Sequence, residues 1–192
     1  FDLAPLAGAG DAAAGWILRL PGKRYLVVAE VERARNAWGS LERAGARPGT
    51  SARWHWASVR SGIAEIVAAT QDQWVPQMLN YELLGAVSFT KGCYPGQEIV
   101  ARTQYRGELK RRTLLLHADA PAPAPGTPVL ASGAPEQSVG AVLASARAPE
   151  GGSDLLACVH LDLAQDAELR LGSVDGARLE RLPLPYALPA AR

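Results

Sequence analysis

The sequence lacks the cysteine pattern of a metal site or a disulfide scaffold. Only two of its 192 residues are cysteines, Cys93 and Cys158, and no CxxC or Cys/His cluster surrounds either. This spacing argues against a zinc site and against an all-protein iron–sulfur site. A disulfide between the two is compatible with the sequence. One such pair in a chain of this length is more typical of a reduced protein, so we predict a cytoplasmic location and no resident metal.

An excess of charge and long apolar runs are also missing. The formal net charge is +1, so wholesale electrostatic binding to nucleic acid or to an anionic membrane is not expected. No apolar run approaches the length that spans a bilayer. The start at Phe1 has neither an initiator methionine nor the segments of a signal peptide. We therefore expect the chain to begin inside a longer protein.

What the sequence does contain predicts mixed α and β structure. Apolar runs on either side of Pro21-Gly22 predict a β-hairpin over residues 16–28, and helical spacing follows over 30–46. The alternation of residues 54–60 predicts a further strand. Pro76 introduces a short helix over 77–82. Pro95 suits the first position of a helix that stops at Gly107.

The character of the chain changes after the basic run Lys110–Arg112. A proline-rich stretch over residues 120–126 separates short apolar segments, which predicts a small antiparallel barrel or sandwich. These segments are 113–117, 129–130, 139–143, 155–159, 169–171 and 179–182. We predict an α+β chain with two domains, residues 1–112 and 113–192. Cys158 falls inside one apolar segment and is expected to be buried.

Residues 91–98, Lys-Gly-Cys-Tyr-Pro-Gly-Gln-Glu, carry the richest chemistry in the chain. Cys93 lies just ahead of the predicted helix, where free N–H groups and the helix dipole stabilise an anion, and Lys91 adds a full positive charge. Gly92 and Gly96 permit a positive φ and close approach by a ligand. Cys93 is therefore a candidate reactive sulfur with Lys91 as its electrostatic partner. The alternative is an inert small hydrophobe, the commoner role of a lone cysteine.

The same segment closely resembles the KGCYxGQE signature of the YgfZ-type folate-binding proteins, relatives of the aminomethyltransferase (T-protein) of glycine cleavage. Flanking matches extend the likeness over roughly residues 16–112: Arg60-Ser61-Gly62-Ile63, Trp74-Val75-Pro76-Gln77, Leu79-Asn80, Gly85, Ser88-Phe89, Ile99-Val100-Ala101-Arg102, Arg106-Gly107 and Lys110-Arg111. Two departures stand out. Pro95 occupies a position where a small hydroxyl residue is expected. The family's N-terminal portion, about a third of the expected protein, is absent.

The resemblance implies a partial aminomethyltransferase-like folate-binding domain followed by a β-barrel. It implies a tetrahydrofolate-binding accessory protein for assembly or repair of iron–sulfur clusters in other enzymes, with Cys93 as the functional thiol. Its partners would be folate and iron–sulfur client or assembly proteins, with no nucleic acid and no membrane, and we expect a monomer.

A folate needs an apolar or aromatic slot for the pterin, a carboxylate or amide for its donor edge, and a basic group for its glutamate tail. The candidate contacts are Arg60, Tyr94, Gly96, Gln97, Glu98 and Arg102. Structural roles compete with these: Glu98 can complement the helix dipole, and Arg102 can belong to a solvated helix face. The basic run Lys110–Arg112 is expected to be solvated, although it could attract a polyglutamate tail or an acidic client.

Two other functions stay open from sequence, so the chain is not assigned as an enzyme. A one-carbon transferase would hand a methyl or aminomethyl group to tetrahydrofolate. The related aminomethyltransferase has no cysteine in this loop, which disfavours that reading. A non-catalytic folate-binding or redox-sensing module would use Cys93 only as a sensor of oxidation.

Overall fold

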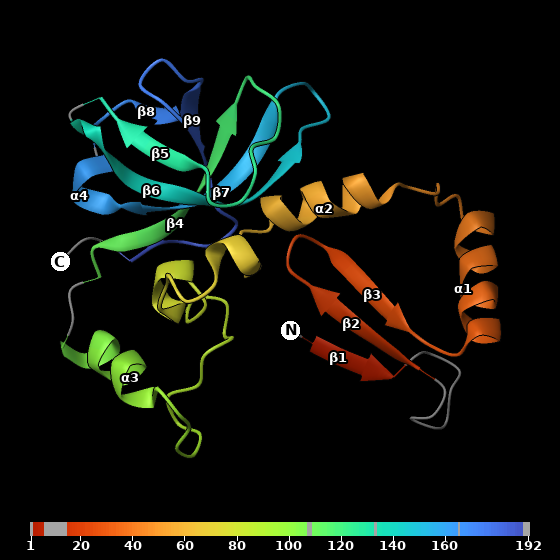
Figure 1. Ribbon diagram of the computed structural model, residues 1–192. Helices are drawn as coiled ribbons and strands as arrows, with labels where there is room; N and C mark the ends of the chain where they lie inside the picture. The colour runs from red at the N-terminus through yellow and green to blue at the C-terminus, as the bar shows by residue number, and fades with distance from the viewer. Residues whose placement is uncertain (1, 6–14, 107–108, 133, 165, 190–192) are drawn as a thin grey trace. The chain divides into compact units, whose positions relative to one another are not determined.

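The computed structural model describes residues 2–5, 15–106, 109–132, 134–164 and 166–189 (Figure 1). The chain divides into two compact units, residues 1–54 and 55–192. The predicted boundary at residue 112 is a different division and stays a prediction. None of the described helices combines the length and the apolar character that a bilayer crossing requires.

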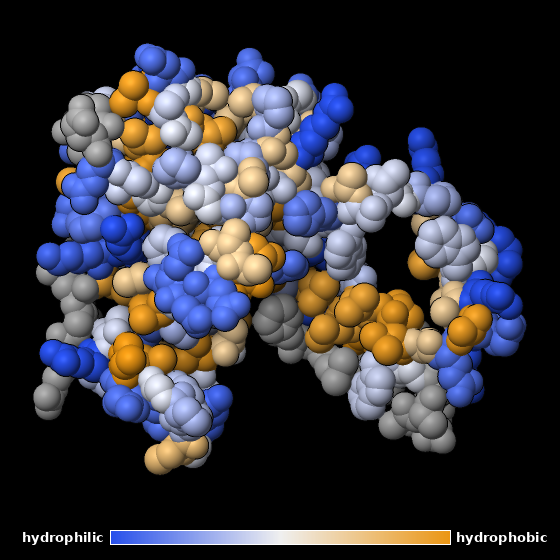
Figure 2. Space-filling model, viewed as in Figure 1, coloured by the Kyte–Doolittle hydropathy of each residue, from blue (hydrophilic) through white to orange (hydrophobic). Residues whose placement is uncertain are grey.

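The first unit contains a three-stranded antiparallel sheet and one helix. Strands β1 (Asp2–Pro5), β2 (Trp16–Leu20) and β3 (Arg24–Val28) pair in the order β1-β2-β3. The β2–β3 pair confirms the predicted hairpin, whose turn contains Gly22 at φ 77°. Helix α1 (Val31–Arg43) follows and has no buried residue. Figure 2 shows apolar side chains gathered over β2 and β3 on the face in view.

The strand predicted over residues 54–60 is wrong, because this segment lies in helix α2 (Ser51–Arg60). Thr50 begins the helix: its Oγ1 accepts a hydrogen bond from the backbone N–H of Arg53 at 3.3 Å, as an N-cap does. Trp56 and Val59 share a helical face at i, i+3 spacing and pack on the core of the second unit. Seven residues offered too short a window to separate this spacing from strand alternation.

The second unit is built on a closed six-stranded barrel. Its strands are β4 (Arg111–Ala118), β5 (Pro128–Ala131), β6 (Ala134–Arg147), β7 (Ser153–His160), β8 (Leu169–Leu171) and β9 (Arg178–Leu182). They run in the order β4-β7-β6-β5-β8-β9, and neighbouring strands pair antiparallel all round the barrel. A short helix, α4 (Leu161–Ala164), follows β7. The predicted small antiparallel barrel and the α+β class are confirmed.

Two hydrophobic cores lie on opposite sides of the barrel wall, and β7 contributes to both. Leu155 and Val159 belong to the cluster shared by all six strands, which fills the interior. Leu156 and Cys158 point the other way and pack with Val59 of α2. This alternation places consecutive side chains on opposite faces of a strand that is buried on both.

The segment between α2 and the barrel is mostly short turns. Two 3₁₀ helices, η2 (Ala68–Thr70) and η3 (Pro76–Leu79), precede helix α3 (Gln97–Arg106). Pro76 begins η3, which is shorter than the predicted helix. The prediction that Pro95 is the first residue of α3 is wrong: Gly96 has φ 82°, which a right-handed helix excludes, so α3 begins at Gln97. The predicted stop at Gly107 lies outside the described residues.

Candidate functional site

The cysteine loop, residues 85–96, leads from the turns after η3 into α3 (Figure 1). Ser88 folds its middle: the hydroxyl oxygen accepts hydrogen bonds from the backbone N–H groups of Lys91 at 3.2 Å and Thr90 at 3.4 Å. Gly96 ends the loop in a left-handed conformation that favours glycine. The loop therefore holds Cys93 four residues before the first residue of α3.

Cys93 is a free thiol on the surface. Within the described part of the chain, its sulfur has no hydrogen-bond or ion-pair partner. The ammonium of Lys91 lies over the ring of Tyr94, 4.6 Å from the ring centroid, in a cation–π contact. Lys91 thus contacts the face of the Tyr94 ring. The predicted electrostatic effect of Lys91 on Cys93 stays a prediction.

Cys158 is the opposite kind of cysteine, as predicted. It is fully buried, and its thiol lies 3.7 Å from the carbonyl oxygen of Met78. Burial raises the pKa of Cys158 to about 12, an effect that the positive charge of Arg111 partly opposes. At neutral pH this sulfur is a protonated packing group without access to reagents.

Helix α3 is tied to η3 through a buried amide. The side-chain Nε2 of Gln77, on η3, donates a 2.7 Å hydrogen bond to the backbone carbonyl of Val100. Val100 is also the buried apolar residue of α3, at 7% exposure. A second contact lies within this region, where the rings of Phe89 and Tyr105 meet edge to face at 6.3 Å. These contacts anchor the helix that follows the thiol.

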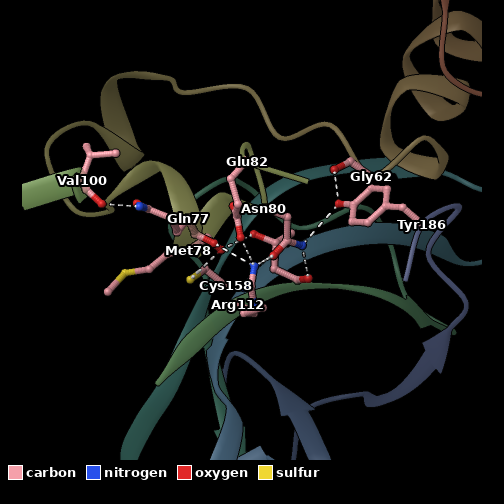
Figure 3. A network of polar contacts seen from close by, with 10 residues as sticks. Gly62, Gln77, Met78, Asn80, Glu82, Val100, Arg112, Cys158 and Tyr186 are labelled. Carbon is pink, nitrogen blue, oxygen red and sulfur yellow. Dashed lines mark hydrogen bonds and ion pairs between the residues drawn. The ribbon is translucent and has the colours of Figure 1, made fainter. Parts of the chain in front are cut away.

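A network centred on Arg112 joins η3 to the first barrel strand (Figure 3). The Nη1 atom of Arg112 lies 2.7 Å from Oε1 of Glu82, and both side chains are about nine-tenths buried. The same nitrogen donates to the backbone oxygen of Gln77 at 3.2 Å and to Oδ1 of Asn80 at 3.1 Å. The expectation that residue 112 belongs to a solvated basic run is therefore wrong. Glu82 supplies the opposite charge that makes burial of a guanidinium tolerable.

Asn80 extends this network toward the end of the chain. Its Nδ2 donates to the carbonyl of Thr113 at 2.8 Å and to the hydroxyl of Tyr186 at 3.3 Å, and that hydroxyl donates to the carbonyl of Gly62 at 2.8 Å (Figure 3). Burial raises the pKa of Tyr186, which keeps the hydroxyl protonated as a donor. Gly62 is required here, since an added Cβ would lie 2.7 Å from the Tyr186 ring and its φ is 72°.

Arg60 belongs to a separate cluster around Asp154. The Asp154 carboxylate accepts hydrogen bonds from Nε1 of Trp56 and Nδ1 of His117, both at 2.8 Å, and the Arg60 guanidinium lies 3.7 Å away. Asp154 is 4% exposed, so these partners compensate a buried charge. The cluster fastens α2 to β4 and β7. Arg60 thus has a structural role that the sequence did not reveal, and its predicted contact with folate stays a prediction.

The remaining candidates lie together on the loop and the first turns of α3. Tyr94 and Gln97 are half-buried, whereas Gly96, Glu98 and Arg102 are exposed. Glu98 falls in the first turn of α3, where a carboxylate also complements the helix dipole. Among the described residues, no three His, Cys, Asp or Glu side chains gather as a metal site would need.

Comparison of the sequence with known proteins relates the chain to one group. A protein from Edwardsiella ictaluri is 37% identical over 170 residues, which are 87% of this chain and 51% of that protein. Proteins from Klebsiella pneumoniae and Yersinia pestis are 34% and 37% identical over 89% and 88% of the chain, and 52% of their own lengths. All three are named tRNA-modifying protein YgfZ. The chain is of the YgfZ type. No family model matches it.

The YgfZ-type chain spans about half the length of the curated relatives it matches. Its buried Arg112–Glu82 pair was missed by sequence reasoning, because 30 residues separate the partners. In the sequence, Gln77 and Asn80 stand out only through the family resemblance. Their buried positions explain why an amide is needed at each: one bonds a helix carbonyl, the other bonds a strand carbonyl.

Proposed function

We propose that this chain is part of a tetrahydrofolate-binding accessory protein that supports assembly or repair of iron–sulfur clusters, with Cys93 as its reactive sulfur. The observation that carries the proposal is the contrast between the two thiols: Cys93 is exposed on an anchored loop, and Cys158 is sealed in the core. A single exposed thiolate can form a mixed disulfide, carry a sulfur atom or ligate one iron of a cluster transiently. It cannot hold a cluster alone, so a client protein must supply the other ligands.

The name of the relatives adds tRNA modification, which the sequence analysis did not suggest. The two activities are compatible if the client enzyme carries an iron–sulfur cluster and itself modifies tRNA. Under this proposal the chain acts on the enzyme rather than on the RNA. The formal net charge of +1 supports that choice, because it gives the chain no general attraction for a polyanion.

The candidate folate contacts fit that ligand in kind. The Glu98 carboxylate would accept hydrogen bonds from the pterin donor edge, and the Arg102 guanidinium would pair with the glutamate tail. The Tyr94 ring already contacts Lys91, and Arg60 lies beside Asp154. These residues would therefore supply only part of a folate site, and the rest would come from polypeptide that this chain does not include.

Complementation tests the proposal. A chimaera in which this chain replaces the matched region of the Edwardsiella protein, placed in a bacterium deprived of its own YgfZ protein, should restore a cluster-dependent enzyme and the modified nucleosides of its tRNA. Cys93→Ser should abolish both, and Cys158→Ala should abolish neither. Calorimetry should find the same tetrahydrofolate affinity before and after Cys93→Ser. Restoration by Cys93→Ser would overturn the role of the thiol, and turnover of a one-carbon donor by that variant would favour a transferase.

A further inference from the structure

The loop after β4 and the turn that joins β6 to β7 form an open pocket of about 460 Å³ in the second unit. This volume lies in the range of small-molecule sites in proteins. The pocket wall combines two opposite charges with a short apolar stretch, and its residues are Asp119, Ala120, Pro121, Ala122, Arg147 and Gly152. None of these residues belongs to the cysteine loop or to the Arg112 network, so the pocket is a separate feature of the barrel.

The pocket lies at one end of the barrel, on the side of the wall that faces the interior. Ala118 belongs to the interior cluster, and the strand register pairs it with Ser153, which also pairs with Arg147. Side chains of directly paired residues lie on the same face of a sheet, so Ser153 and Arg147 share the interior face with Ala118. Ala120, from the pocket wall, packs against the same cluster. Ser153 is therefore on the side of the sheet that the pocket occupies.

Ser153 carries a buried hydroxyl without a partner. Its exposure is 0%, and among the described residues its Oγ has no hydrogen-bond partner. An unpaired buried hydroxyl costs free energy, so native proteins normally pair such a group with water or a ligand. Gly152 comes directly before it, at φ 60°, and an added Cβ there would collide with the Ala118 carbonyl oxygen. This close contact between the turn and β4 fixes Ser153 beside the pocket.

Arg147 and Asp119 place opposite charges on the pocket wall. Both side chains are exposed, and within the described part of the chain neither forms an ion pair or a hydrogen bond. The guanidinium of Arg147 suits a carboxylate, which it can bind through two parallel hydrogen bonds. The carboxylate of Asp119 repels a simple anion and attracts an ammonium group. The two charges together therefore favour a ligand that carries both signs.

We propose that this pocket binds a small zwitterion, an α-amino acid with an apolar side chain. Arg147 pairs with the ligand carboxylate, Asp119 pairs with its ammonium group, and residues 120–122 contact its apolar part. The hydroxyl of Ser153 donates a hydrogen bond to the same carboxylate, which supplies the partner that it lacks. The site goes beyond the proposed function, because it requires neither folate nor Cys93.

Three related probes, titrated into the full ¹⁵N-labelled chain and followed by NMR, test the proposal. L-leucine carries both charges, 4-methylpentanoate lacks the ammonium group, and isopentylamine lacks the carboxylate. We expect L-leucine to give saturable shifts in the amide resonances of residues 119–122 and 147–153, with a Kd below about 1 mM. The other two probes should bind at least about tenfold more weakly, because each leaves one charge of the pocket without a partner.

Substitutions separate the contributions of the pocket residues. Arg147→Gln should weaken L-leucine binding at least about tenfold. Asp119→Asn should weaken L-leucine by a similar factor and strengthen 4-methylpentanoate, because it removes the repulsion of an anion. Ser153→Ala should weaken L-leucine several-fold and leave the melting temperature of the free chain unchanged or raised, because it removes an unpaired hydroxyl. Arg178→Gln and Asp175→Asn are the matched controls: both residues are exposed and lie outside the pocket lining, and both variants should bind as the parent does.

Equal affinity for L-leucine and 4-methylpentanoate would overturn the proposal, because the site would then be one for carboxylates alone. Shifts that do not saturate, or that fall outside the pocket, would overturn it as well. So would unchanged L-leucine affinity in Arg147→Gln and Asp119→Asn. The complementation result for Cys93 involves none of these residues, so failure of one proposal is distinguishable from failure of the other.

Discussion

The two cysteines should differ in alkylation rate by orders of magnitude in the folded chain. Burial raises the pKa of Cys158 to about 12, from an ordinary value near 9. Only the thiolate reacts, so ionisation alone slows Cys158 on the order of 10³-fold relative to an ordinary thiol at neutral pH. Its lack of solvent exposure lowers the rate further. Cys93 is open to the reagent.

Limited treatment with iodoacetamide at pH 7.5, followed by peptide mass spectrometry, measures both rates in one sample. We expect label at Cys93 alone until the reagent is in large excess. Cys93→Ala should leave a chain that resists labelling, and Cys158→Ala should label as the parent does. In urea both thiols should react at similar rates, because unfolding removes the burial of Cys158.

Labelling of Cys158 within tenfold of Cys93 in the folded chain would refute this reasoning. It would mean that the wall between α2, η3 and the barrel opens often enough to expose Cys158, since that thiol packs there with Val59 and Leu79. The contrast on which the proposed function depends would then be lost. Protection of Cys93 would be equally damaging, because it would place the loop against other residues.

Three further predictions concern stability. The folded state holds the Cys158 proton that the unfolded chain releases from about pH 9, so the free energy of unfolding should fall as pH rises. Between pH 8 and pH 10, urea unfolding should show a loss about 1 kcal/mol larger in the parent chain than in Cys158→Ala. Arg112→Met should cost about 3–5 kcal/mol in the same assay because it leaves Glu82 buried without its partner, and Glu82→Met in the same chain should recover part of the loss. Gly140→Ala should cost about 3 kcal/mol or more, because its Cβ would lie 2.2 Å from the Cys158 carbonyl oxygen, whereas Gly92→Ala has nothing within 4 Å and should change the melting temperature little. Equal effects of the two alanines would contradict the contact between β6 and β7.

The barrel was predictable because its signal is local. The apolar segments are separated by turns of glycine, proline, serine and aspartate, and seven of the eight residues of β7 are buried, so its apolar run over residues 155–159 could be recognised. Helix α2 was not predictable in the same way. Trp54, Trp56 and Ser58 alternate with His55 and Ala57 as strand residues do, and Thr50, which caps the helix, lies before this alternating segment. The packing of Val59 in the core of the second unit then favours the helix over the strand.

The candidate site was only partly predictable. The sequence identified Cys93 as the exposed thiol and Cys158 as the buried one, because composition around a cysteine reflects its burial. It could not show that Lys91 contacts Tyr94, or that Arg60 contacts Asp154 from 94 residues away. Such pairs depend on how separate elements meet in space. The charge of Arg112 predicted that its side chain would be solvated. Its pairing with Glu82, which is distant in sequence, allows the side chain to be buried instead.

The way the thiol is held limits the kind of partner it suits. Arg112 bonds the backbone of Gln77, and the Gln77 side chain bonds Val100 in α3, so a continuous series of buried polar contacts connects the barrel to the helix behind the loop. Cys93 itself stands beyond this anchor, exposed and without a partner in the described part of the chain. The helix behind Cys93 is anchored, but the thiol itself is exposed to solvent and does not line an enclosed pocket among the described residues. Its exposed position is compatible with the proposed approach of a cysteine or a metal carried by a client protein.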